Sequence, residues 1–168
     1  DNNMQETNES DSLLMEVLTD DVFRELYKKF CAGSLVVEPV CFYEDYCEFS
    51  DETVTNNKRL VQVAKYLIEK YCDDNSPLQL NLPNRKQLVQ PIEATIAEYE
   101  QRLAKHLSLG EESPNRGGER WVDPKLFHAI YLVCINDMNN DTFVRFKKTK
   151  EYLTYLKEKR SLENKQKT

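Results

Sequence analysis

Two helical stripes that meet at a polar corner set the strongest constraint on how this chain can fold. Between residues 127 and 146, apolar side chains recur at the spacing of one buried helix face: Phe127, Ile130, Tyr131, Cys134 and Met138. The pattern breaks at residues 139–141, Asn-Asn-Asp, whose short side-chain oxygens can accept hydrogen bonds from the free amides of a helix start. A second helix with inward-facing Phe143 and Phe146 follows at once, so the sequence predicts two abutting helices.

The predicted corner carries three polar side chains, Asp141, Thr142 and Arg145. One interpretation is a helix terminus offered to a protein partner. The other is a capped helix with a solvated arginine, and spacing alone favours this second interpretation. The corner is therefore a candidate site that needs support from elsewhere in the chain.

Helical spacing of apolar residues also dominates the rest of the chain, and no stretch shows the convincing alternation of a strand. The further amphipathic stretches are residues 13–18, 23–30 and 57–71. Residues 39–49 are apolar nearly all round, which predicts a helix buried on most sides. Gly33 allows a positive φ and can end one helix, and Pro39 fits the first turn of the next. Residues 85–107 have helical composition, but Pro91 predicts a kink or two pieces. The chain is therefore predicted to be all-α, with eight or nine helices.

Polar composition predicts a loose N-terminal arm and one long loop. Residues 1–10 hold too few apolar groups to offset the cost of ordering, so we expect a flexible arm. Residues 110–124 are rich in glycine, proline and charge, and Trp121 is expected to tether the end of this loop to the core. The basic C-terminal end is typical of a solvated helix terminus, and contact with a membrane surface or a further domain is the weaker interpretation.

Charge, hydropathy and cysteine content exclude several classes of protein. The formal net charge of -6 argues against broad nucleic-acid binding, which needs basic patches that displace counterions from phosphates. No apolar run approaches the roughly 20 residues that span a bilayer. The five cysteines are odd in number and lack zinc-site spacing, so we expect reduced thiols in a cytosolic protein. A length of 168 residues suggests one domain with a real core.

Residues that could carry catalysis are few. His106 and His128 have no cysteine or carboxylate arranged beside them as a dyad, and the phosphate-binding loop and the HExxH zinc motif are both absent. Glu44, Asp45 and Glu48 could share a divalent ion at helical spacing, but a solvated face is the favoured interpretation. We therefore expect no enzyme, no metal site and no cofactor.

Two segments together resemble the regulator of G-protein signalling (RGS) domain. The first, residues 27–49, reads YKKFCAGSLVVEPVCFYEDYCEF and is similar without a gap to the family pattern FxxFLxxExSxENIxFWxxCExY. The second, from Phe127 onward, is similar without a gap to FxxAQxxIxxLMxxDSYxRFxxSxxY. The resemblance covers about residues 13–156. The run NSPLQLNLP and a long insertion are similar to the RGS-like domain of Rho guanine-nucleotide exchange factors.

This resemblance implies an all-α, two-lobed bundle of about nine helices over residues 11–160. It places an insertion at about residues 95–123, and it leaves the arm 1–10 and a basic tail 161–168 outside the bundle. The implied function is to bind the GTP-bound α subunit (Gα) of a heterotrimeric G protein and to accelerate its GTP hydrolysis by stabilising the switch segments, which ends signalling. The domain would supply no catalytic residue. We expect a cytoplasmic monomer that associates peripherally with the inner face of the plasma membrane.

The resemblance assigns six residues to the Gα contact: Glu38, Pro39, Asp137, Asp141, Thr142 and Arg145. Pro39 replaces a family asparagine that touches the catalytic machinery of Gα, and Asp137 replaces a hydrophobic contact residue. These departures leave an alternative, an RGS-fold scaffold, adaptor or effector-like module that binds a protein without activating a GTPase. A helical domain with only a chance likeness is the third interpretation. A preference for activated Gα would distinguish a Gα-binding domain from the scaffold.

Overall fold

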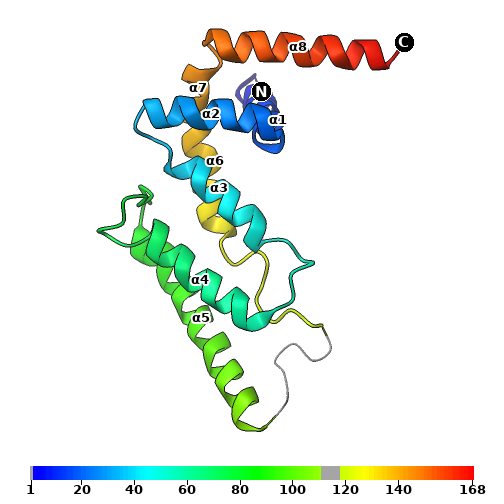
Figure 1. The fold of residues 1–168 in the computed structure, drawn as a ribbon. Coiled ribbons are helices and arrows are strands. Elements are labelled where there is room, and N and C mark those ends of the chain that lie inside the picture. The colour runs from blue at the N-terminus through cyan, green and yellow to red at the C-terminus, as the bar shows by residue number, and fades with distance from the viewer. Residues whose placement is uncertain (1, 111–117) are drawn as a thin grey trace. The chain divides into compact units, whose positions relative to one another are not determined.

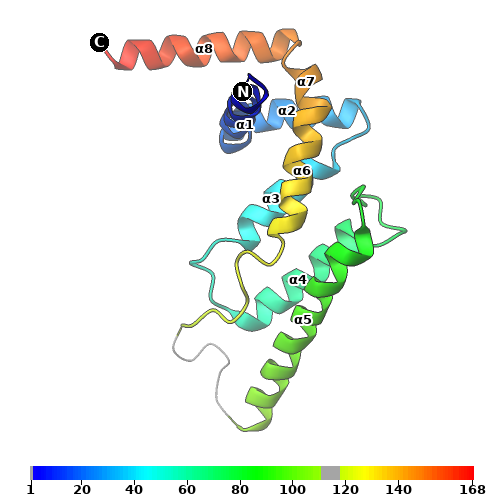
Figure 2. The same ribbon diagram turned by 180° about the vertical axis from the view of Figure 1, so that it is seen from behind.

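The computed structural model describes residues 2–110 and 118–168, with side chains described from Asp11 onward. In this described part, helices joined by loops make up the chain and there is no strand, as predicted for an all-α fold. The helices are α1 (Asn2–Thr19), α2 (Asp21–Gly33), α3 (Glu38–Phe49), α4 (Asn57–Tyr71), α5 (Arg85–Ser108), α6 (His128–Asn140), α7 (Thr142–Phe146) and α8 (Lys150–Gln166) (Figures 1 and 2). None of the described helices is long and apolar enough to cross a membrane.

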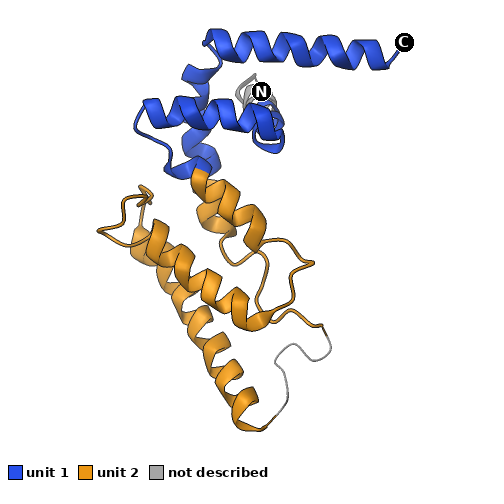
Figure 3. Cartoon of the chain, viewed as in Figure 1, with its two compact units in different colours: residues 1–40, 134–168 blue, residues 41–133 orange. Residues whose placement is uncertain are grey.

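The chain divides into two compact units, in keeping with the expected two lobes (Figure 3). Unit 1 comprises residues 1–40 and 134–168, and unit 2 comprises residues 41–133. The arm expected over residues 1–10 stays a prediction, because the side chains before Asp11 lie outside the described part of the chain.

An aromatic cluster forms the core of unit 1. Phe23 and Tyr27 of α2 are fully buried, and so is Phe146 of α7. The ring centroids of Tyr27 and Phe146 lie 5.1 Å apart, and those of Phe146 and Tyr152 of α8 lie 5.4 Å apart. Tilted and edge-on aromatic pairs at these separations add to the free energy gained by burying the rings. This cluster therefore fixes α7 against α2, where the polar corner begins.

Asp20 caps the start of α2 and also joins it to α8. Its carboxylate accepts hydrogen bonds from the backbone amides of Val22 and Phe23, at 3.1 and 2.9 Å. The same carboxylate accepts a bond from the Tyr155 hydroxyl at 3.1 Å and lies 3.3 Å from the Lys159 ammonium. One side chain thus satisfies a helix start and anchors the first half of α8.

In unit 2, the buried face of α3 packs against aromatic residues from two other segments. The Phe42 ring lies edge-on to Tyr71 at 5.2 Å, and the Phe49 ring lies edge-on to Phe127 at 5.2 Å. Asn56 caps α4 by accepting a hydrogen bond from the Arg59 amide at 3.1 Å. The predicted amphipathic helix over residues 57–71 is confirmed at both of its ends.

Helix α5 agrees in extent with the helix expected over residues 85–107, because it runs from Arg85 to Ser108. It continues through Pro91 as one helix, so of the two alternatives at this proline the division into two pieces is wrong. The first half of the expected insertion is therefore helical. The predicted tether near Trp121 is present, because the Trp121 amide donates to the buried Asn57 side chain at 2.8 Å and the Arg102 guanidinium lies 4.3 Å from the indole ring.

Candidate functional site

The predicted polar corner exists in unit 1, but it is capped differently from the expectation. Helix α6 ends at Asn140 and α7 begins at Thr142, with Asp141 between them. The Asp141 side chain makes no capping bond to the start of α7, so the prediction of a side-chain cap there is wrong. Its amide instead continues the hydrogen bonding of α6, since it donates to the Asp137 carbonyl at 3.1 Å, while its backbone angles lie outside the helical region. The carboxylate is thereby left for another partner.

That partner is Arg145, one helical turn later. Nε and Nη2 of Arg145 donate to the two carboxylate oxygens of Asp141, at 3.1 and 3.2 Å. Nη1 donates to the Ser34 hydroxyl at 3.3 Å, and the guanidinium lies 5.8 Å from the centre of the Phe30 ring. The Arg145 side chain is nevertheless 46% exposed. It is therefore held in one orientation from two sides while its face remains accessible.

Thr142 lies beneath the corner rather than on it. The residue is 2% exposed, and its hydroxyl is hydrogen bonded to the Tyr27 hydroxyl at 2.6 Å. Burial raises the pKa of the Tyr27 phenol well above its usual value. Burial also raises the pKa of the neighbouring Cys31 thiol to about 11. These groups stay protonated at neutral pH, so Thr142 ties α7 to α2 through an uncharged interior bond.

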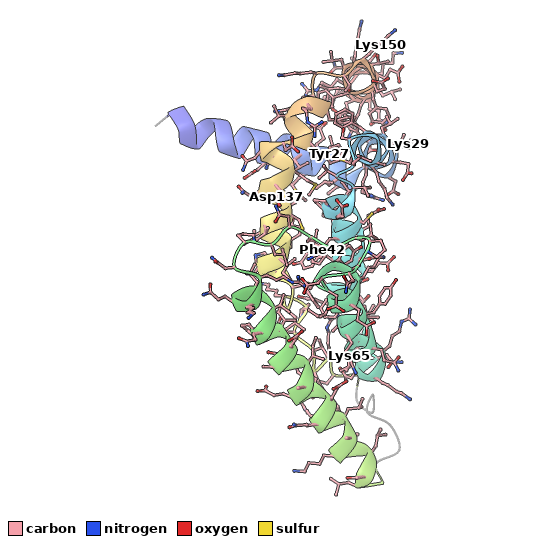
Figure 4. All side chains as sticks on the ribbon, turned by 90° about the vertical axis from the view of Figure 1, so that its left-hand side faces the viewer. Tyr27, Lys29, Phe42, Lys65, Asp137 and Lys150 are labelled. Carbon is pink, nitrogen blue, oxygen red and sulfur yellow. The ribbon has the colours of Figure 1, made fainter. Side chains whose placement is uncertain are left out.

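Asp137 lies one turn before Asp141 on α6, and its side chain is exposed (Figure 4). Removal of part of its hydration by neighbouring atoms raises the pKa of this carboxyl above its ordinary value. Because positions four residues apart share a helix face, Asp137 and Asp141 place two carboxylates along one edge of the corner. Only the second of them is paired with Arg145 among the described contacts.

Glu38 and Pro39 begin α3, at the far end of the loop that holds Ser34. Glu38 is half-buried and Pro39 is buried. Proline suits this first helical turn because the amide it lacks would have no partner inside the helix. Pro39 therefore presents no polar atom at the surface, whereas Glu38 leaves part of its side chain accessible.

Two further residues of this loop were not predicted from the sequence. Ser34 contacts Arg145, and Leu35 is 88% exposed with a φ of 60°. Gly33 ends α2 as expected, but it does not use the positive φ that glycine allows, and Leu35 takes the left-handed conformation instead. A bulky residue rarely adopts this conformation. No periodicity in the sequence predicts these features, because the Ser34 contact and the Leu35 conformation both depend on the path of the loop toward α7.

The described residues of the corner bring exposed carboxylates and a guanidinium together on one surface. Within the described ranges, no group of three or more His, Cys, Asp or Glu side chains is placed to hold a metal ion. In the acidic cluster of α3, Asp45 is already engaged, because it accepts hydrogen bonds from Lys70 at 2.8 Å and from Tyr71 at 2.6 Å. The corner offers directed charges and hydrogen-bonding groups on a fixed backbone, which suits recognition of another protein.

The sequence matches the family model of the regulator of G protein signaling domain over residues 14–155, which is most of the chain. The matched range includes residues 27–49 and the segment from Phe127 onward that contains the corner. No curated protein matches the sequence significantly.

Proposed function

The chain belongs to the regulator of G protein signaling domain family, and from this premise we propose that it binds the GTP-bound α subunit of a heterotrimeric G protein and accelerates GTP hydrolysis. Domains of this family are regulatory GTPase-activating modules and do not themselves catalyse a reaction. The domain would act as a monomer in the cytoplasm, at the inner face of the plasma membrane, and its action would end the signal.

The observation that supports this proposal most is the orientation of Arg145. A free arginine loses considerable side-chain freedom when it binds a partner. Here, Asp141 and Ser34 already restrict the guanidinium, and the side chain remains 46% exposed. Binding through a restricted side chain costs less entropy, so more of the contact energy contributes to affinity.

The proposed mechanism needs no reactive group from this chain. In Gα, an arginine supplied in cis stabilises the charge of the transition state and a glutamine orients the attacking water. A partner that binds the hydrolysis-competent switch conformation more tightly than other conformations increases its population. Each tenfold gain in rate requires about 1.4 kcal/mol of such differential binding. A few polar contacts at the corner are therefore enough to produce a substantial acceleration.

The six assigned residues divide into two roles in this proposal. We assign direct contact to Glu38, Asp137, Asp141 and Arg145, which have accessible side chains. Thr142 and Pro39 are buried and act as support. Thr142 fixes α7 through Tyr27, and Pro39 fixes the start of α3 and with it the direction of Glu38.

Binding without activation is the second candidate function, and Pro39 is the observation that favours it. At this position the family pattern has an asparagine, whereas this chain has a buried residue with no side-chain hydrogen-bonding group. A domain with this change could hold activated Gα through the corner and leave the hydrolysis rate unaltered. It would then act as an adaptor or effector-like module.

Binding to a panel of Gα subunits in three states tests the proposal: with GDP, with a non-hydrolysable GTP analogue, and with GDP and aluminium fluoride. We expect the aluminium fluoride state to bind most tightly, because it resembles the transition state. Arg145→Glu should abolish this preference. Arg160→Glu, which makes the same charge change on the exposed part of α8, should preserve it. Equal binding to all three states, or full binding by Arg145→Glu, would refute the proposed contact.

A further inference from the structure

Helices α4 and α5 of unit 2 run side by side (Figures 1 and 2). Side chains of both helices line a groove between them. The groove has a volume of about 320 Å³. Small-molecule sites range from roughly 300 to 1,000 Å³, so this groove lies at the lower end of that range and has room for one or two inserted side chains. All residues that line it belong to unit 2, whereas the proposed Gα contact lies in unit 1, so a role for the groove does not depend on that contact.

The floor of the groove is apolar. It is formed by Ile68 of α4 together with Ile96 and Ala97 of α5. The two isoleucines are mostly covered, at 7% and 6% exposure, and Ala97 is open to solvent. The small side chain of Ala97 keeps this part of the floor low. An apolar side chain from outside could therefore be buried against all three residues.

The rim of the groove is acidic. Glu69 and Asp73 lie on the α4 side and Glu93 lies on the α5 side, and all three are exposed. In the part of the chain that the structure describes, none of the three forms an ion pair. At the other end of the groove, Lys65 of α4 forms an ion pair with Glu100 of α5 at 2.7 Å. Carboxylates that converge on an apolar channel make a negative potential, which attracts cations and repels anionic surfaces.

We propose that this groove docks a basic amphipathic segment of a protein partner. The segment would insert one or two apolar side chains onto Ile68, Ile96 and Ala97, and it would place lysine or arginine opposite Glu69, Asp73 and Glu93. Seven residues of α5 separate Glu93 from Glu100, which at about 1.5 Å per residue is roughly 10 Å, or two helical turns. A short helix with apolar anchors on one face and basic residues beside them fits both the length and the charge of the groove.

Fluorescence anisotropy on the full chain tests this with a labelled helical peptide of about 14 residues, long enough to extend past both ends of the groove. The probe carries two leucines one turn apart and flanking lysines, and a second peptide replaces the lysines by glutamates. We expect the lysine peptide to bind and the glutamate peptide not to bind. High salt should weaken the binding, because at about 1 M ionic strength charges are screened beyond about 3 Å.

Charge-reversal variants separate a specific rim from general attraction to an acidic protein. Glu69→Lys with Glu93→Lys should weaken binding about tenfold or more, because the lysines of the peptide then face lysines on the rim of the groove. Glu98→Lys with Glu163→Lys makes the same change in net charge at exposed residues that do not line the groove, and should change binding less than about threefold. Equal losses in the two double variants would overturn the proposal.

Filling the groove tests its floor without changing any charge. Ala97→Trp should weaken the lysine peptide about tenfold by occupying the space that its leucines need. Ala104→Trp, on the same helix beyond the Glu100 end, is the matched control and should bind normally. Both residues are exposed, so both variants should fold, which circular dichroism checks. Unchanged binding by Ala97→Trp would overturn the proposal.

Sedimentation velocity of the chain alone distinguishes a second copy from a separate partner. We expect a monomer at concentrations where the peptide is bound. Self-association that Glu69→Lys with Glu93→Lys removes would instead assign the groove to a second copy of this chain, and the partner proposed here would be wrong.

Discussion

Removing the phenolic hydroxyl of Tyr27 should destabilise unit 1, because it leaves the buried Thr142 hydroxyl without its 2.6 Å partner. A buried polar group that loses its hydrogen bond costs about 1–3 kcal/mol. The nearby Cys31 thiol is a weak substitute, so Tyr27→Phe should fall in the middle of this range, at about 2 kcal/mol. In a chain of this size, such a loss lowers the melting temperature by roughly 4–8 °C.

A double-mutant cycle shows whether the effect comes from the bond itself. Thr142→Val, which keeps the shape of the side chain, should cost about as much as Tyr27→Phe. The double variant should cost about 2 kcal/mol less than the sum of the singles, because neither hydroxyl is then left unpaired. Urea unfolding followed by far-ultraviolet circular dichroism measures all four proteins. Additive losses, or single losses below about 0.5 kcal/mol, would refute the buried bond.

Three further perturbations test other parts of the structure. Burial acts to raise the pKa of Asp20, but hydrogen bonds from Phe23, Lys159 and Tyr155 outweigh it and lower this pKa below its ordinary value of 3.8. The free energy of unfolding should therefore decrease as the pH falls through about 4 and below. Asp20→Asn should flatten this decrease in urea titrations from pH 7 to 3. Arg120→Met should destabilise unit 2 by about 2 kcal/mol in urea unfolding followed by Trp121 fluorescence, because the Arg120 guanidinium donates to the carbonyls of Phe49 and Asp51 at 2.7 and 2.8 Å; an unchanged midpoint would contradict this role. Pro39→Asn restores the asparagine side chain of the family pattern. If its absence limits activation, this variant should accelerate GTP hydrolysis by Gα about tenfold more, a difference of about 1.4 kcal/mol in activation free energy. An unchanged rate in a folded variant would show that the corner alone determines the effect.

The elements that the sequence predicted correctly are those in which local pattern and burial agree. Helix α4 begins and ends where its apolar stripe does, because the residues at that spacing are the ones that lie in the core. The break between α6 and α7 was also visible, since Asp141 interrupts the stripe. The aromatic residues expected to face inward on α7, Phe143 and Phe146, are buried.

The site was predicted less completely because its geometry depends on distant contacts. Arg145 is oriented by Ser34, which is 111 residues away in the sequence, and nothing in the local pattern joins them. Thr142 was expected at the surface from its place in the polar corner, but its hydroxyl finds Tyr27 in the interior. Local composition likewise allowed a positive φ at Gly33, whereas the path of the loop gives one to Leu35.

The proposal that this chain is a GTPase-activating domain is tested most directly by single-turnover GTP hydrolysis on a panel of Gα subunits, with and without the domain. We expect acceleration of at least one Gα, loss of that acceleration with Arg145→Glu, and its retention with Arg160→Glu. Tight binding to activated Gα without acceleration would leave the adaptor role. If the domain neither binds nor accelerates any subunit of the panel, the proposed function is contradicted.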